Sequence, residues 1–165
     1  MIPIRDTIPS RRVAWMTRLL LAANLLAFIW QISQGRALAT SLYRLGVVPA
    51  HWMLTSPGDL LNWPPLFVSL LTSQFLHGGL LHLGANMLYL WIFGDNVEDR
   101  LGPGRFLSLY LGSGVFAAVT QLLMTPHSSV PMIGASGAIA GVLGAYLRLF
   151  PTARIITIIP MLFFF

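Results

Sequence analysis

The chain contains long runs of apolar residues that a small soluble core could not bury. A membrane-spanning helix needs about 20 predominantly apolar residues, and such runs cover residues 13–32, 66–93, 105–124 and 132–149. Of the 165 residues, 56% are hydrophobic and only 9% are charged, whereas soluble domains carry about 25% charged residues. The runs therefore predict an all-α fold, a polytopic transmembrane bundle with four complete spans.

The segments between the runs are polar or rich in turn residues. Residues 34–65 form a long loop whose prolines and aromatic residues suit a position at the membrane interface. Residues 94–104 form a short charged loop. Residues 155–165 look like the start of a fifth span, because eleven residues rise only about 16 Å. We expect an N-terminal segment of residues 1–12, then a membrane domain of residues 13–165 that is a fragment of a longer protein.

The arginines predict how the chain is oriented in the membrane. If the spans alternate in direction, most arginines fall on the N-terminal side, and only Arg36 and Arg44 fall on the other. The N-terminal side holds Arg5, Arg11, Arg12, Arg18, Arg100, Arg105, Arg148 and Arg154. Because arginine-rich loops stay in the cytoplasm, we predict a cytoplasmic N-terminus and an outward-facing loop of residues 34–65.

Composition also excludes several classes of function. Cysteine is absent, which rules out disulfides, thiolate metal sites and a cysteine nucleophile. The net charge of +5 comes from dispersed arginines rather than a basic arm, so nucleic acid is not an expected partner. The histidines lack further ligands at metal spacing, and neither a metal nor a cofactor is expected. The sequence makes no prediction of oligomeric state.

Four polar residues inside the predicted spans are candidates for function. Polar groups in a span are costly and often functional. The second span carries His77, His82 and Asn86, and the fourth carries Ser136. His82 and Asn86 are four residues apart, which places them on one helical face. His77 would lie well round the helix and nearer the outer surface.

His82 and Ser136 are predicted to lie at similar depth. Thirteen residues, or about 20 Å of helix, separate His82 from the cytoplasmic marker Asp95. Ser136 stands about 18 Å before the arginine that ends the fourth span. Because these spans run in the same direction, a histidine, an amide and a hydroxyl would lie in nearly one plane. Gly134 and Gly137 leave room for a substrate main chain beside Ser136.

The fourth span is also built for close packing. Small residues recur at three- and four-residue spacings, which lets helix backbones approach: Gly134, Gly137, Gly141 and Gly144. By residue chemistry alone, other interpretations stay open. Ser136 could serve packing, and His82 with Asn86 could hydrogen-bond between helices or line the pore of a channel or transporter.

Two motifs resemble the rhomboid family of intramembrane serine proteases. They are His-x4-His-x3-Asn, within HGGLLHLGANMLYLWIFGDNVEDRLGPGRF, and Gly-x-Ser-Gly, within GASGAIAGVLGAY. The resemblance implies a Ser–His dyad endopeptidase that cuts transmembrane substrate proteins in the lipid bilayer, with roles in regulated proteolysis. It implies that Ser136 is the nucleophile and that His82 and Asn86 stabilise the oxyanion. His77, Gly134 and Gly137 would support the site, and a bacterial cytoplasmic membrane is the expected location.

The sequence departs from the family pattern in three places. Val68 and Ser69 stand where many members have a Trp-Arg pair, and Ala140 replaces an aromatic residue expected to pack on the catalytic histidine. The family's base lies on a sixth span, so the catalytic histidine is expected beyond residue 165. The alternative is a non-catalytic rhomboid-like protein that binds client transmembrane segments.

Overall fold

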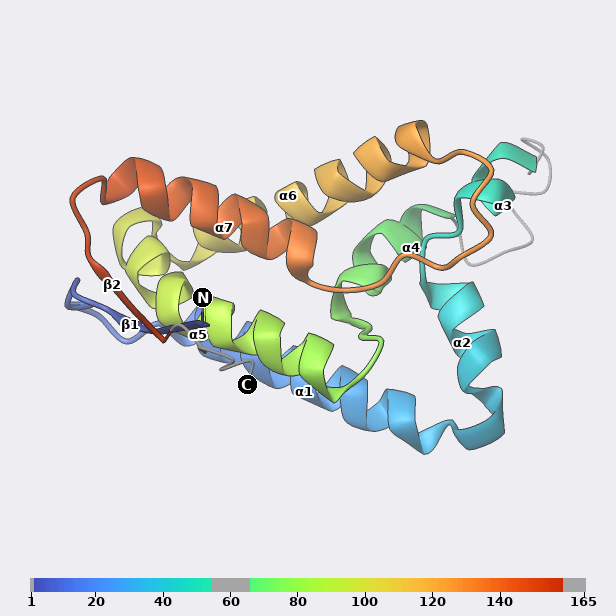
Figure 1. The fold of residues 1–165 in the computed structure, drawn as a ribbon, viewed down its shortest axis with the longest axis horizontal. Helices are drawn as coiled ribbons and strands as arrows, with labels where there is room; N and C mark the ends of the chain where they lie inside the picture. The colour runs from blue at the N-terminus through green and yellow to red at the C-terminus, as the bar shows by residue number, and fades with distance from the viewer. Residues whose placement is uncertain (1, 55–65, 159–165) are drawn as a thin grey trace, which may run out of the picture.

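The computed structural model describes residues 2–54 and 66–158, which are mostly helical (Figure 1). Before the gap lie strand β1 (Ile2–Asp6), helix α1 (Trp15–Ser33), the 3-10 turn η1 (Gly35–Ala37), α2 (Leu38–Leu45) and α3 (Pro49–Leu54). After it lie α4 (Leu66–Thr72), the 3-10 turn η3 (Ser73–Phe75), α5 (Leu80–Leu101), α6 (Pro103–Met124), α7 (Ser136–Leu149) and strand β2 (Ile155–Ile158). Most of the described part of the predicted interfacial loop, residues 34–54, is thus helical.

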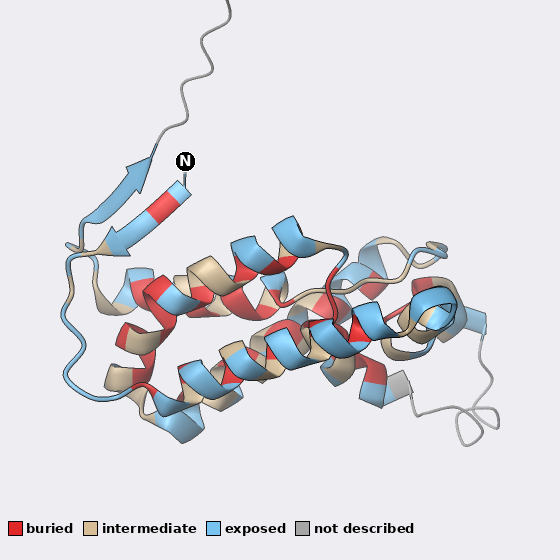
Figure 2. Cartoon of the chain, turned by 90° about the horizontal axis from the view of Figure 1, so that it is seen from below, coloured by how far each residue is buried: buried red, intermediate tan, exposed pale blue. Residues whose placement is uncertain are grey.

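Helix α1 turns polar side chains inward and apolar side chains outward. Thr17, Asn24 and Gln31 are buried and follow one another at seven-residue spacing, which keeps them on one face. The exposed face carries Leu19, Leu25, Leu26, Ile29 and Ile32. In Figure 2 the other long helices likewise turn buried residues inward and exposed residues outward. An exposed apolar surface of this extent indicates contact with lipid.

Among the residues described, two helices, α1 and α6, are long and apolar enough to cross a membrane. They coincide with the first and third predicted spans. Helix α7 is apolar but has only 14 residues, and it begins at Ser136 rather than at residue 132. The helical bundle is therefore confirmed, whereas the number of spans stays a prediction.

The second predicted span is wrong as a single helix. The chain leaves helical geometry after η3, and residues 76–79 connect it to α5. Leu76 is extended, with φ of −89° and ψ of 148°, and two glycines follow His77. Because glycine disfavours continued helix, this is where the run breaks. Helix α5 then runs to Leu101, so most of the predicted loop of residues 94–104 is helical instead.

The all-helical prediction also missed a two-stranded sheet. Strand β2, expected to begin a fifth span, pairs antiparallel with β1 at one end of the molecule (Figure 1). β-branched residues favour a strand, and β2 reads Ile-Ile-Thr-Ile. Residues 159–165, the rest of the expected span, lie outside the described residues.

The main core lies where α5 packs against α1, α6 and α7. Leu90, Phe93, Tyr110, Val142 and Tyr146 are all nearly inaccessible there. The turn from α5 to α6 is tight and centres on a glycine at position 102, whose φ of +79° disfavours any side chain. This packing sets α5 and α7 side by side, and these two helices carry the predicted site residues.

Candidate functional site

The connection before α5 is held by a side chain from α1. The backbone N–H of His77 donates to Gln31 Oε1 at 2.9 Å, and Gln31 Nε2 donates to the His77 carbonyl at 2.5 Å. Both residues are buried. His77 therefore lies in a clamped connection rather than on a helix, and its exposed fraction is zero. One amide satisfies both backbone groups, which would otherwise be costly to bury.

His82 lies in the first turn of α5 and its ring has a defined hydrogen bond. The backbone N–H of Gly78 donates to His82 Nδ1 at 3.3 Å. A neutral imidazole that accepts at Nδ1 carries its proton on Nε2. The ring of His77 packs edge-on against that of His82, with centroids 5.2 Å apart. His82 thus presents Nε2–H as a donor.

Asn86 lies one turn after His82 on the same face, as the four-residue spacing predicts. Its side chain is 6% exposed. Among the described residues, no acceptor pairs with its Nδ2 group. A buried amide without a partner costs free energy, which makes Asn86 Nδ2 an unpaired donor beside Gly134.

Gly134 lies against both donors. A Cβ built on Gly134 would stand 2.8 Å from His82 Nε2 and 3.9 Å from Asn86 Nδ2. Its φ of +125° also disfavours a side chain. The N–H of Gly134 donates to the Ser73 carbonyl at 2.8 Å. Glycine is therefore required here for both space and backbone conformation.

Ser136 is the first residue of α7 and is exposed. It lines a cavity of about 350 Å³ together with Gln74, Gly114, Gly134 and Gly137. No side chain caps the start of α7. The first N–H groups of a helix point out of its end and favour negative charge. Gly134 thus lies against the two donors on α5 and also lines the cavity of Ser136, whereas His82 and Asn86 are not among the residues that line this cavity.

Ser136 does not form a complete dyad with the histidines near it. Among the described residues, no hydrogen bond joins Ser136 to His77 or to His82. A histidine that donates through Nε2–H cannot accept a proton there. In the described part of the chain, therefore, no histidine is placed to accept a proton from Ser136.

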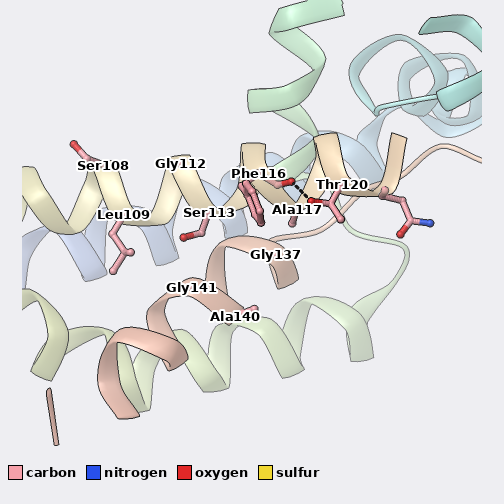
Figure 3. Close-up of a pocket in the computed structure, with 11 residues that line it drawn as sticks. Ser108, Leu109, Gly112, Ser113, Phe116, Ala117, Thr120, Gly137, Ala140 and Gly141 are labelled. Carbon is pink, nitrogen blue, oxygen red and sulfur yellow. Dashed lines mark hydrogen bonds between the residues drawn. The ribbon is translucent and has the colours of Figure 1, made fainter. Parts of the chain in front are cut away.

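The glycines after Ser136 set α7 close to α6. A Cβ on Gly137 would meet Ala117 Cβ at 2.5 Å, and one on Gly141 would overlap Ser113. Figure 3 shows these residues beside a cavity of about 630 Å³, which Ala140 also lines. Close packing was predicted for Gly144 too, but a Cβ there would meet nothing within 4 Å.

Sequence reasoning missed Gln31 and the buried polar residues of η3. Gln74 fills the space beside Gly114 and donates to the Leu70 carbonyl at 2.9 Å. The signal was available for Gln31, because it is a polar residue at the end of an apolar run and shares a face with Asn24. No group of three or more metal-ligating side chains occurs in the described parts of the chain.

Comparison with known proteins identifies relatives. The Rhomboid domain family matches residues 65–165. The mitochondrial Rhomboid protein 1 of Saccharomyces cerevisiae is 38% identical over 122 residues, which is 70% of this chain and 35% of that protein. The Rhomboid protease GluP of Bacillus subtilis is 46% identical over 78 residues, or 47% of this chain and 15% of that protein.

A third relative covers more of the chain. The human mitochondrial presenilin-associated rhomboid-like protein is 33% identical over 150 residues, which is 88% of this chain and 36% of that protein. The chain thus spans about a third or less of the length of these curated relatives. No solved structure matches it.

Proposed function

The chain belongs to the rhomboid family, a family of membrane-embedded proteins, and on that basis we propose that it is an intramembrane serine endopeptidase whose nucleophile is Ser136. The observation that carries the proposal is the position of Gly134. It holds the chain that leads into Ser136 against two side-chain donors of α5. Transmembrane proteins are the proposed substrates, and the N-terminus is proposed to be cytoplasmic.

His82, Asn86 and the Ser136 backbone N–H are the proposed oxyanion donors. Attack of the Ser136 hydroxyl on a peptide carbonyl places negative charge on the carbonyl oxygen. Donors aimed at that charge stabilise the transition state more than the substrate, each by about 3 kcal/mol. His82 Nε2–H and the unpaired Asn86 Nδ2 are of the required type.

The proposed general base is a histidine of another segment of the full-length protein. A serine hydroxyl is a weak nucleophile until a neighbouring base accepts its proton. His82 serves as a donor, and His77 is fully buried behind it. Ala140 is exposed one turn after Ser136, beside the cavity in Figure 3. Because Ala140 replaces the aromatic residue expected there, the ring of the proposed base histidine would be oriented by other contacts.

Cleavage of a model transmembrane substrate in liposomes tests the proposal. In the full-length protein, Ser136→Ala should lower the rate at least about 10³-fold, whereas Ser113→Ala on α6, matched in size and chemistry, should not. His82→Ala and Asn86→Ala should lower kcat more than they raise KM, because they act on developing charge. Undiminished cleavage by the Ser136 variant would refute the assignment.

A non-catalytic rhomboid-like protein that binds client segments is the second candidate. The absence of a histidine bonded to Ser136 among the described residues favours it. In that case the wild type would not cleave the substrate in the liposome assay, but a cross-linker would still join the substrate to the protein. The family match favours both candidates over a channel or transporter.

A further inference from the structure

A chain of contacts runs from α1 to the ring of His82. The two hydrogen bonds between Gln31 and the His77 backbone fix the plane of the connection before α5. The next residue, Gly78, directs its N–H at His82 Nδ1. Gln31 is only 3% exposed and His77 is fully buried, so water does not replace these bonds.

Residues 76–79 do not fix their own backbone, so this series of contacts has to hold them. Residues 76–79 are not helical, and two of the four are glycines with a wide choice of backbone angles. The His77 ring also packs on the His82 ring. Removal of the Gln31 amide would strand a buried N–H and a buried carbonyl, and the connection would turn to satisfy them.

We propose that Gln31 is a positioning residue that holds the His77–Gly78 backbone so that His82 keeps its proton on Nε2 and directs it toward Gly134. The use of this Nε2–H group as a donor to the oxyanion rests on the proposed function. The placement of a buried amide on α1 thus sets the tautomer of a ring on α5.

The first measurement is the tautomer of His82 by 15N NMR, on the protein with 15N-labelled histidine in lipid nanodiscs. We expect the Nε2–H form to predominate in the wild type. Gln31→Met keeps the side chain's length and removes both hydrogen bonds, and it should shift a measurable fraction of His82 to the Nδ1–H form. A wild type with mainly Nδ1–H would overturn the proposal even if the variant failed to fold.

Asn24→Leu is the matched control. Asn24 is also a buried amide on the same face of α1, but it bonds to the Leu20 carbonyl and to Tyr110. Both variants lose a buried amide, yet only the Gln31 variant should change the His82 tautomer. An equal change in both variants, or no change in a folded Gln31→Met protein, would refute a positioning role.

The second measurement is kinetic and uses the full-length protein. Gln31→Met should lower kcat by about 10- to 100-fold with little change in KM, because misplacement of a catalytic group by about 1 Å costs up to about 10²-fold. Asn24→Leu should leave kcat nearly unchanged. If no protein cleaves substrate, the proposed function fails, while the NMR result still decides whether Gln31 positions His82.

Discussion

Glu98 on α5 holds the start of α1 through hydrogen bonds, and its removal should lower the free energy of unfolding strongly. Glu98 lies in the last turn of α5, is 5% exposed, and accepts three hydrogen bonds from the start of α1. The donors are the Met16 N–H at 2.9 Å, the Thr17 N–H at 2.7 Å and the Thr17 hydroxyl at 2.8 Å. The carboxylate thereby caps a helix that has no cap of its own.

The cost of Glu98→Ala follows from these contacts. A hydrogen bond to a charged acceptor contributes about 1.5–3 kcal/mol. The Thr17 hydroxyl can turn to another acceptor, whereas the two backbone N–H groups cannot. The loss of those two bonds gives about 3–6 kcal/mol, and removal of the negative charge at the start of α1 adds about 0.3–1 kcal/mol.

Reversible unfolding in mixed micelles, followed by tryptophan fluorescence, measures this cost. The control is Asp99→Ala at the next position, which loses one exposed bond from the Arg11 N–H at 3.2 Å. Its free energy of unfolding should change by no more than about 0.5 kcal/mol. If Glu98→Ala and Asp99→Ala lose the same free energy, the carboxylate does not hold α1 to α5.

Three further substitutions test the site, helix α7 and the sheet end of the bundle. Gly134→Ala should lower the free energy of unfolding by about 2–4 kcal/mol, since it adds backbone strain and a clash with His82. The control Gly144→Ala, in open space, should stabilise α7 slightly. Equal thermal stability of the two variants would contradict this reasoning. Asp6→Ala should lower the free energy of unfolding by about 1–3 kcal/mol in the same assay, because Asp6 accepts hydrogen bonds from the Tyr146 hydroxyl at 2.6 Å and from Asn96 Nδ2 at 2.8 Å. An unchanged unfolding midpoint would show that the N-terminal strand does not stabilise α7.

Hydropathy alone predicted the helices that face lipid on most of their surface. The first and third runs match α1 and α6 to within about two residues at each end. It missed the break before α5, because the run of residues 66–93 is apolar on average although His77, Gly78 and Gly79 interrupt it. The glycines favour the break, and Gln31, which lies more than forty residues earlier in the sequence, satisfies the His77 backbone that the break leaves unpaired. Hydropathy does not record such a contact.

The site was predicted in part. The spacing of His82 and Asn86 correctly places both on one face of α5, since helical periodicity depends only on local geometry. The bond from Gly78 to His82, and the sheet between β1 and β2, join segments whose meeting depends on the tertiary fold. Neither could be read from residue type. The roles of His82, Asn86 and Ser136 in catalysis stay predictions.

Reaction with a fluorescent fluorophosphonate tests the central claim most directly, because this reagent forms a covalent bond with an activated serine. The full-length protein in its own membrane should be labelled, and Ser136→Ala should abolish the label while Ser113→Ala leaves it unchanged. Equal labelling of the wild type and the Ser136→Ala variant would show that Ser136 is not the nucleophile.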